Sequence, residues 1–424
     1  MTATSLCRTA TAMVMLATGT TVVVAGIFRP QRSSLVIVTL DTTRADRLPA
    51  YGFAGVATPT IDALVSRGAV FDEAVSVAPL TLPAHTSLFT GLYPPHHGVR
   101  DNGDAPLDRS HTTLAALLRA RGFRTGAFVG SVVLSADRGL SEGFDVYDDG
   151  STGSERAPHR RSATEVIDRA SAWIRSLNEG ASFFLWVHLY DVHAPQTPPL
   201  EFRRTYGDRY EGGIAYVDSE IGRLLDVLRQ RRLLDHTVQL IAGDHGESLG
   251  EHGEAQHGLL VYDSTMHVPL IVAGPGVAPG RIRIPTSLVD ILPTVCDLLH
   301  VPAPAGDGRS LMPAVRGTAV PDRLVYGESM YPRRFGQTPI RMVRDGRFKY
   351  IAARQPELYD LQNDPSELHD VSAARRSVMS ALAQILQRID ASDDRPSPAG
   401  GLDPERRRRL EALGYASGRQ PYEQ

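Results

Sequence analysis

The stretch VQLIAGDHGESLGEHG, residues 238–253, joins an apolar run to a loop of ionisable residues and glycines. Its first six residues are apolar or β-branched enough for a strand that is covered on both faces. Asp244 and His245 follow directly, in a loop whose glycines let the backbone turn sharply around a ligand. A buried strand that ends in charged groups predicts an α/β sheet with a ligand site at its carboxyl edge.

Further apolar runs of this kind occur along the chain. They are LVIVTL from Leu35, TGAFVGS around Ala127, FFLWVHLY from Phe183 and VPLIVAG from Val268. Helical patterns lie between them, at residues 112–121 and in an apolar stripe with three- and four-residue steps formed by Ile214, Val217, Ile221, Leu224 and Leu228. Alternating strands and helices predict an α/β/α sandwich around a mostly parallel central sheet.

Three of these runs end in ionisable groups. Asp41 follows the first, Asp191 and His193 follow FFLWVHLY, and Asp244 with His245 follows VQLIAG. Because the carboxyl ends of parallel strands meet at one edge, we expect a shared site there. Asp41, Asp244 and His245 supply two carboxylates and an imidazole, which suit a divalent cation such as Mg²⁺, Mn²⁺, Zn²⁺ or Ca²⁺. We expect irregular stretches at 145–161 and 196–210 to form the rim of the pocket.

A threonine stands in front of a predicted helix within APLTLPAHTSLFTGLYPPHHGV, residues 78–99. The helix is expected from about Pro83 to Thr90, with Gly91 ending it. Thr81 has two readings. It can serve only as the N-cap of this helix. Alternatively, its hydroxyl lies at a helix N-terminus beside a divalent cation, where an anion is favoured, and attacks a bound oxyanion ester.

Composition and charge indicate which partners and which cellular location to expect. The net charge of −3 gives no electrostatic case for a nucleic-acid partner. Only two cysteines occur, and Cys7 lies in a predicted leader, so no disulfide framework is expected. Residues 9–28 carry no charge, which predicts a signal peptide or membrane anchor within residues 1–30. We therefore expect an exported protein: periplasmic, extracellular or anchored to the outer face of the membrane.

The sequence pattern changes near Pro321, where the apolar runs become shorter. Short strand-like pieces, RLVYGES, IRMVRDG and RFKYIAA, precede ELYDLQNDPSE and a helical stretch at 373–389. This pattern predicts a small antiparallel sheet with a covering helix. The expected organisation is a leader at 1–30, a catalytic domain at 31–320, a C-terminal subdomain at 321–400 and a charged helix or tail at 401–424.

Several sequence blocks together resemble the sulfatase family of the alkaline phosphatase superfamily. They include LDTTRADRLPAYG, TLPAHTSLFTGLYPPHHGV, WVHLYDVHAPQTPP, GDHGESLGEHGEAQHG and ELYDLQNDPSE, and they span nearly the whole chain after the leader. The resemblance implies that family's fold and a metal-dependent hydrolase of anionic esters. It also implies that Asp41, Thr81, Asp244 and His245 bind the metal, with Thr81 at the position of the nucleophile.

Four further residues are candidates to hold the charged oxygens of an ester or to protonate its leaving group. They are His85, Asn102, His193 and His257. By the resemblance, Asn102, His193 and His257 match groups that contact the oxyanion or the leaving oxygen. The predicted catalytic residues are therefore Thr81, His193 and His257, and the predicted substrate-binding residues are His85, Asn102, His193 and His257.

The chain departs from the family motif at the nucleophile. Sulfatases carry C/S-x-P-x-R, whose first residue is oxidised to formylglycine, whereas this chain reads Thr81-Leu82-Pro83-Ala84-His85. Threonine bears a methyl on its carbinol carbon, so oxidation could give only a ketone, and no formylglycine is expected. Related branches of the superfamily attack phosphorus with an unmodified threonine, which favours a phosphodiester, phosphomonoester or phosphonate substrate. Thr42 replaces a second aspartate of many sulfatases and leaves the identity of the metal open.

Three alternatives remain open at the level of sequence. One is a sulfuric ester hydrolase in which Thr81 attacks sulfur directly. Another is a transferase that moves a phosphoglycerol or phosphoethanolamine group onto an acceptor. The third is a binding protein that keeps the fold without the reaction. The set Asp41, Thr81, Asp244 and His245 argues against the third, because a protein without catalysis has no need of metal ligands.

Overall fold

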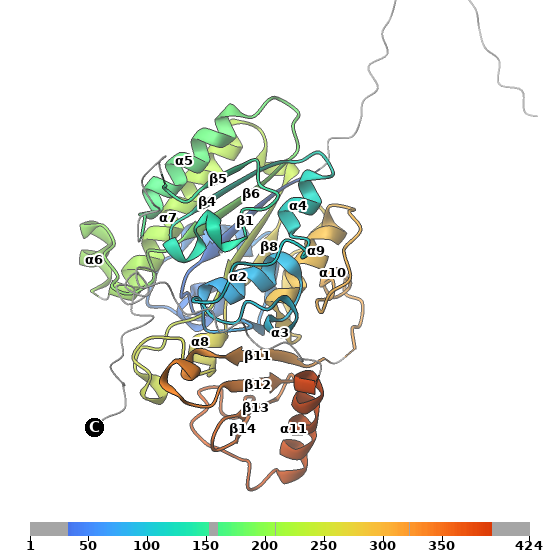
Figure 1. Ribbon diagram of the computed structural model, residues 1–424. Helices are drawn as coiled ribbons and strands as arrows, with labels where there is room; N and C mark the ends of the chain where they lie inside the picture. Colours follow the sequence, from blue (N-terminus) through green and yellow to red (C-terminus); the bar gives the residue numbers. More distant parts are fainter. Residues whose placement is uncertain (1–32, 152–159, 208, 322, 392–424) are drawn as a thin grey trace, which may run out of the picture. The chain divides into compact units, whose positions relative to one another are not determined.

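The computed structural model describes residues 33–151, 160–207, 209–321 and 323–391. An eight-stranded sheet runs through it, and Figure 1 labels five of its strands, β5, β4, β6, β1 and β8. The strand order is β5-β4-β6-β1-β7-β8-β2-β9. Its strands are β1 (Ser34–Leu40), β2 (Gly68–Phe71), β4 (Arg124–Val129), β5 (Val146–Asp148), β6 (Phe183–Leu189), β7 (Thr237–Gly243), β8 (Leu270–Ala273) and β9 (Gly280–Ile282). All neighbours pair in parallel except β8, which is antiparallel to both β7 and β2. The predicted mostly parallel sheet is confirmed.

The central strand β1 explains why the predicted strands read as unbroken apolar runs. Every residue of β1 is buried. Leu35 and Ile37 pack into the core on one face of the sheet, while Val36 and Val38 pack into the core on the other. Because successive side chains of a strand point to opposite faces, a strand covered twice is apolar at nearly every position.

Helices cover both faces of this sheet. On one face lie α1 (Pro59–Val65), α5 (Ala163–Ser176) and α7 (Arg209–Gln230). On the other lie α2 (Thr81–Thr90), α4 (Leu114–Arg119), α9 (Ile291–Leu298) and α10 (Met312–Val315). The predicted apolar stripe from Ile214 to Leu228 is the buried side of α7. The helix begins earlier than the stripe, and the α/β/α layering expected from the sequence is present.

Shorter elements complete the connections. The short α-helices are α3 (Pro94–His97), α6 (Leu200–Tyr206) and α8 (Asp263–Met266), and β3 (Ala74–Val75) pairs with β10 (Thr286–Ser287). Short 3₁₀ helices occupy Ala45–Arg47, Pro49–Tyr51, Val132–Leu134, Ala136–Arg138, Leu234–His236, Glu251–Gly253, Leu288–Asp290 and Tyr331–Phe335. The presence of α6 corrects the expectation that residues 196–210 are irregular throughout.

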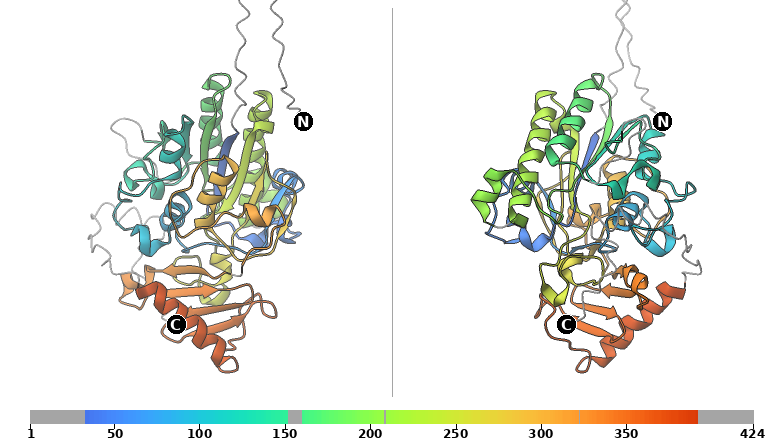
Figure 2. Two further views of the ribbon diagram at one scale, coloured as in Figure 1. Left: turned by 90° about the vertical axis from the view of Figure 1, so that its right-hand side faces the viewer. Right: turned by 60° about the vertical axis from the view of Figure 1, so that its left-hand side comes forward.

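A second, smaller sheet follows in the chain. Its strands β11 (Val325–Ser329), β12 (Ile340–Arg344), β13 (Phe348–Ala352) and β14 (Glu357–Asp360) pair antiparallel in chain order. The helix α11 (Arg376–Ala391) covers it, with Leu382 and Leu386 packed on Tyr326 and Val343. Figure 1 and Figure 2 show these strands and α11 together in orange and red. The predicted antiparallel sheet with a covering helix is confirmed, although the helix begins three residues later than expected.

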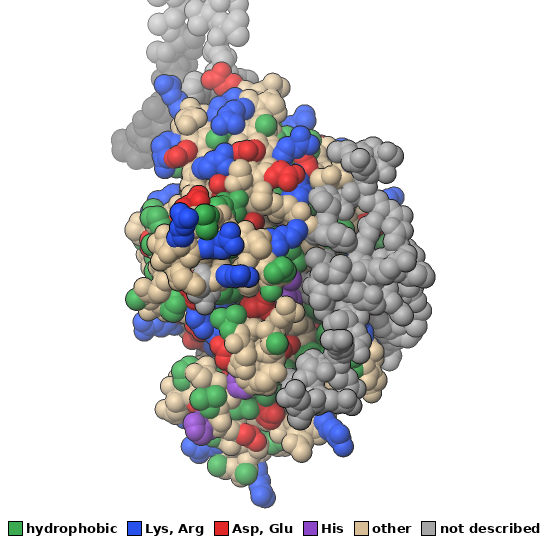
Figure 3. Space-filling view, turned by 90° about the vertical axis from the view of Figure 1, so that its left-hand side faces the viewer, with side chains coloured by type: hydrophobic (Ala, Val, Ile, Leu, Met, Phe, Trp, Pro, Cys, Tyr) green, Lys and Arg blue, Asp and Glu red, His purple; other side chains and the backbone are tan. Residues whose placement is uncertain are grey.

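Parts of the predicted organisation lie outside the described residues. The leader at 1–30 and the charged tail at 401–424 belong there, and the domain bounds stay predictions. Within the described ranges, no helix combines the length and the apolar character needed to cross a membrane. Figure 3 shows basic and acidic side chains intermixed over the described part of one face, in keeping with a net charge of −3.

Candidate active site

Two neighbouring strands bring the predicted metal ligands together. Asp41 follows β1, and Asp244 with His245 follows β7, which pairs with β1 along its whole length. All three side chains are fully buried, and they offer ligand atoms within 4.8 Å of one another. Nε2 of His245 lies 3.9 Å from Oδ1 of Asp41 and 3.6 Å from Oδ2 of Asp244. The shared site expected at the carboxyl edge of the sheet is therefore formed by these two strands.

Each carboxylate has one oxygen held by the protein and one without a partner. Oδ2 of Asp41 accepts a hydrogen bond from Nε2 of His188 at 3.1 Å, while its Oδ1 has none. Oδ1 of Asp244 accepts the backbone N–H of Thr42 at 3.2 Å and of His245 at 2.8 Å, while its Oδ2 has none. Buried oxygens without hydrogen bonds are costly, so two of them at one place fit a bound cation.

The imidazole of His245 is oriented in the same way. Its Nδ1 lies 3.0 Å from the carbonyl oxygen of Gly246, to which it donates, and this leaves Nε2 directed at the two carboxylates. Such an outer hydrogen bond fixes the tautomer of a histidine ligand. Burial raises the pKa of Asp41 and of Asp244, and their mutual repulsion raises that of Asp244 further. Two buried carboxylates ionise together only beside a compensating charge, which a divalent ion supplies.

Thr81 faces these ligands from the first turn of α2. The helix begins at Thr81 with Leu80 as its N-cap, so the reading of Thr81 as a mere N-cap is wrong. Leu80 has an extended backbone, and the helix starts directly after it, two residues before the predicted start at Pro83. Pro83 does not prevent this, because the first turn of a helix tolerates proline. Oγ1 of Thr81 lies 3.3 Å from Nε2 of His245, and the hydroxyl also hydrogen-bonds the carboxylate of Asp41. The hydroxyl is therefore part of the cluster.

His85 lies behind Thr81 and is held on both sides of its ring. Nδ1 is 2.8 Å from the carbonyl oxygen of Thr81, and Nε2 is 2.9 Å from Oγ1 of Thr39. Burial lowers the pKa of His85 to about 3, so the ring is neutral. Because both nitrogens contact protein groups, the geometry supports a role in holding the first turn of α2. It does not support the substrate contact expected from the sequence.

Asn102 presents a hydrogen-bond donor beside the same turn. Its Oδ1 accepts the backbone N–H of Leu82 at 2.9 Å, which fixes the direction of the amide. Its Nδ2 is buried and has no hydrogen-bond partner. A buried amide donor next to Thr81 is suited to an oxygen of an anionic ester.

The two other predicted histidines stand beside His245. The ring centroid of His257 lies 4.6 Å from that of His245 and 5.0 Å from that of His193. Nδ1 of His257 is 2.8 Å from Oε1 of Glu247. Burial raises the pKa of the Glu247 carboxyl to about 8. Nδ1 of His193 donates to the carbonyl oxygen of Ala194 at 2.5 Å, and burial lowers the pKa of this ring to about 3. The structure thus places both rings next to the cluster, with different outer partners.

Sequence reasoning missed His188 and Glu247 and misplaced Asp191. His188 is a polar residue inside the apolar run FFLWVHLY, and that interruption is the signal that could have found it. Glu247 follows His245 by two residues, in the same loop. Oδ2 of Asp191 accepts the backbone N–H of Ala163 at 2.7 Å at the start of α5. Asp191 therefore does not join the cluster.

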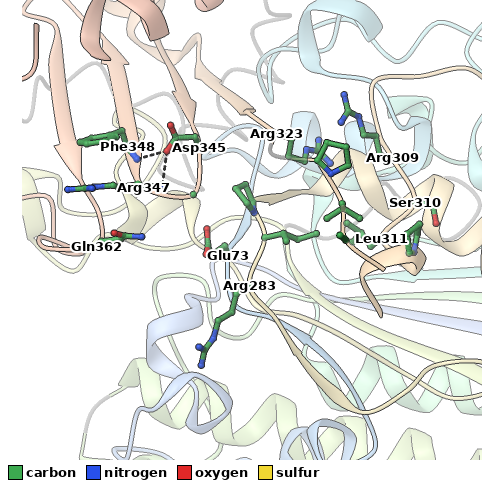
Figure 4. A pocket seen from close by; sticks show the side chains of 17 residues that line it. Glu73, Arg283, Arg309, Ser310, Leu311, Arg323, Asp345, Arg347, Phe348 and Gln362 are labelled. Atoms are coloured by element: carbon green, nitrogen blue, oxygen red, sulfur yellow. Dashed lines mark hydrogen bonds between the residues drawn. The ribbon is translucent and has the colours of Figure 1, made fainter. Parts of the chain in front are cut away.

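A cavity of about 1020 Å³ lies elsewhere, against the small sheet (Figure 4). Glu73, Arg283, Arg309, Leu311 and Phe348 are among the 17 residues that line it. None of the predicted site residues lines this cavity. The cluster around Asp41 and Asp244 is thus a separate feature of the molecule.

Comparisons with known proteins agree with the fold. A family model described as sulfatase matches residues 33–301, and a model of the C-terminal part of N-sulphoglucosamine sulphohydrolase matches residues 250–392. Choline-sulfatase of Rhizobium meliloti is 37% identical over 169 residues, which cover 38% of this chain and 32% of that protein. Arylsulfatase K of Rattus norvegicus is 23% identical over 442 residues, covering 85% of this chain and 78% of the relative. The phosphonate monoester hydrolase of Agrobacterium radiobacter has a TM-score of 0.73 at 24% identity, covering 85% of this chain and 96% of that one.

Proposed function

This chain belongs to the sulfatase family of ester hydrolases, and we propose that it cleaves anionic esters with Thr81 as the nucleophile. The favoured substrate is a phosphodiester, phosphomonoester or phosphonate. One observation carries the proposal: the hydroxyl of Thr81 lies 3.3 Å from Nε2 of His245 and hydrogen-bonds Asp41, inside a cluster suited to a metal. Threonine cannot become formylglycine, so the attacking atom is its own oxygen.

The residues that would hold a divalent ion are Asp41, Thr81, Asp244 and His245. Two carboxylates, a hydroxyl and an imidazole are donors that Mn²⁺, Mg²⁺, Zn²⁺ or Ca²⁺ can accept. When bound, the ion stabilises negative charge on the oxygen of Thr81 and on the ester oxygens. His188 supports this set from behind through its hydrogen bond to Asp41.

The chain's own groups can then carry a double displacement. The oxygen of Thr81 bonds to phosphorus, the bond to the leaving oxygen breaks, and the proton of the hydroxyl passes to the carboxylate of Asp41 that it already contacts. His257 gives a proton to the leaving oxygen. Water then bonds to phosphorus as the bond to Thr81 breaks, one of its protons returns to His257, and Asp41 returns its own to Thr81.

The surrounding side chains assign the other roles. Burial lowers the pKa of both His193 and His257 well below the usual value, so both rings are neutral. His257 is favoured as the proton donor because burial raises the pKa of the Glu247 carboxyl to about 8, so this carboxyl keeps its proton, donates to Nδ1 of His257 and leaves the hydrogen on Nε2. Nδ1 of His193 instead donates to a backbone carbonyl and leaves Nε2 as an acceptor. The unpartnered Nδ2 of Asn102 is placed to donate to a non-bridging oxygen of the ester.

A second candidate is sulfate-ester hydrolysis. The observations that favour it are the family model and the names of two relatives, choline-sulfatase and arylsulfatase K. In this case the oxygen of Thr81 attacks sulfur directly. The likeness to a phosphonate monoester hydrolase concerns the fold, so it does not decide between attack on phosphorus and attack on sulfur.

The test compares full-length wild type with Thr81→Ala and Thr81→Ser, each loaded with Mn²⁺, Mg²⁺, Zn²⁺ or Ca²⁺. Substrates are p-nitrophenyl sulfate, p-nitrophenyl phosphate, p-nitrophenyl phenylphosphonate and bis(p-nitrophenyl) phosphate. We expect a phosphorus ester to turn over fastest, Thr81→Ala to abolish this activity and Thr81→Ser to keep part of it. Thr90→Ala, at the far end of the same helix, is the control and should keep activity.

Two results would count against the proposal. If Thr81→Ala keeps the wild-type rate, Thr81 is not the nucleophile. If p-nitrophenyl sulfate is the fastest substrate and its turnover depends on Thr81, the second candidate replaces the first.

A further inference from the structure

Buried polar atoms without a hydrogen-bond partner gather around the cluster. They are Oδ1 of Asp41, Oγ1 of Thr42, Nδ2 of Asn102, Nδ1 of His188, the hydroxyl of Tyr190, Oδ2 of Asp244 and Oε2 of Glu247. The proposed function accounts for the oxygens of Asp41 and Asp244 and for the amide of Asn102. It gives no task to Tyr190, whose hydroxyl is a donor as well as an acceptor.

Tyr190 lies within the candidate site. It follows β6 directly and is 2% exposed. Its ring stacks on His193 with centroids 4.4 Å apart and planes at 21°, and its centroid is 6.3 Å from that of His188. Burial and the charge of Asp41 raise the pKa of the phenol well above its usual value, so it keeps its proton at ordinary pH. A buried tyrosine hydroxyl ordinarily finds a hydrogen-bond partner, which marks this one as unusual.

We propose that Tyr190 binds the substrate, its hydroxyl donating a hydrogen bond to a non-bridging oxygen of the anionic ester. The proposal rests on the proposed function, since it takes the ester to lie against Thr81. The oxygens of Asp41 and Asp244 are unsuitable lasting acceptors for the phenol, because they are the atoms directed at the ion. An ester group brings oxygens of its own to the cluster, and the phenol of Tyr190 and the amide of Asn102 are two neutral donors for them.

The product anion provides a probe that needs no turnover. Full-length wild type, Tyr190→Phe and the control Tyr359→Phe are loaded with the same metal, and the binding of inorganic phosphate and of inorganic sulfate is measured by calorimetry. Tyr359 is a suitable control because its hydroxyl bonds Glu357 on the small sheet. We expect Tyr190→Phe to weaken the binding of the anion about ten- to hundredfold, the range for a hydrogen bond to a charged group. Tyr359→Phe should leave it unchanged.

Metal content and unfolding temperature separate substrate binding from a structural role. In Tyr190→Phe we expect unchanged metal content and an unfolding temperature without anion that is no lower than that of wild type, because the lost hydroxyl had no partner. Equal affinity of wild type and Tyr190→Phe for both anions would overturn the proposal. So would a lower unfolding temperature with unchanged anion affinity, which would make the hydroxyl structural.

The two proposals can fail separately. If Thr81→Ala keeps hydrolytic activity, the role of Thr81 is lost, yet the calorimetric comparison still decides the role of Tyr190. If Thr81→Ala is inactive and Tyr190→Phe binds both anions like wild type, the nucleophile stands and the role of Tyr190 falls.

Discussion

Nε2 of His188 lies 3.1 Å from Oδ2 of Asp41, across the parallel pair β6 and β1. This hydrogen bond turns the other oxygen of Asp41 toward Asp244 and His245. Hydrogen bonds behind a metal ligand fix its direction, and their loss commonly lowers metal affinity 10–100-fold.

We therefore predict that His188→Leu lowers metal affinity about 10–100-fold, whereas His188→Gln, whose amide can still donate, keeps more of it. Competition with a chromogenic chelator measures the affinity of each variant. Equal affinities of wild type and His188→Leu would show that the contact does not orient Asp41.

His257 provides a second prediction, concerning the leaving group. If it protonates the leaving oxygen, His257→Ala should lower kcat/KM about 10²–10⁴-fold for an ester of a poorly acidic alcohol. The loss should be smaller for a p-nitrophenyl ester, because p-nitrophenolate departs with little help from an acid. Rates across a series of aryl phosphoesters measure this dependence, with the exposed His369→Ala as control. The same dependence in wild type and His257→Ala would rule out this role.

Thr39 links two buried rings, which leads to a prediction about stability. Its Oγ1 accepts the indole N–H of Trp186 at 3.0 Å and lies 2.9 Å from Nε2 of His85. Thr39→Val keeps the shape and leaves both groups without a partner, so we expect the free energy of unfolding to fall by about 1–3 kcal/mol. Denaturant unfolding measures the change. The exposed Thr205→Val should shift it by no more than about 0.5 kcal/mol.

Activity should also respond to Thr39→Val, because His85 holds the carbonyl oxygen of Thr81 at 2.8 Å. If Thr39→Val has the free energy of unfolding and the kcat of wild type, His85 does not hold the first turn of α2.

Glu254 gives a prediction about pH. Burial raises the pKa of its carboxyl to about 8, while the ordinary value for glutamate is about 4.3. A group whose pKa is raised on folding contributes stability that is complete below its unfolded pKa and is lost as pH rises through its folded pKa. The contribution of Glu254 should thus be complete near pH 4 and disappear as pH approaches 8.

The matched variant is Glu254→Gln, whose side-chain oxygen can still accept the N–H of Leu259 that Glu254 accepts at 2.7 Å. Thermal unfolding between pH 5 and pH 8 should show less loss of stability in this variant than in wild type. The exposed Glu201→Gln is the control and should follow wild type. Parallel profiles for wild type and Glu254→Gln would contradict the buried, protonated state of Glu254.

The sheet and the grouping of Asp41, Asp244 and His245 could be predicted from sequence because both follow from local pattern. An unbroken apolar run marks a strand covered twice, and a charged residue after such a run lies at the carboxyl edge wherever the strand sits in the sheet. This is sufficient to bring Asp41 near Asp244 and His245 without knowledge of the strand order.

Other features depend on strand order and on side-chain direction, which local pattern does not encode. His188 meets Asp41 only because β6 pairs with β1. Asp191 follows β6 as well, but its carboxylate caps the start of α5. His85 lies one helical turn after Thr81 and was expected to face the substrate, yet its ring points between Thr39 and the backbone of Thr81. These directions are decided by packing between segments far apart in the chain.

The most direct test of the central claim is to look for the covalent intermediate on Thr81. Metal-loaded wild type is mixed with p-nitrophenyl phosphate, quenched in acid at short intervals, digested and examined by mass spectrometry of the peptide that contains Thr81. The account predicts a phosphoryl group on Thr81 in wild type and no modified peptide in Thr81→Ala. Turnover of the same substrate with Thr81 unmodified at every interval, or with the phosphoryl group on another residue, would contradict it.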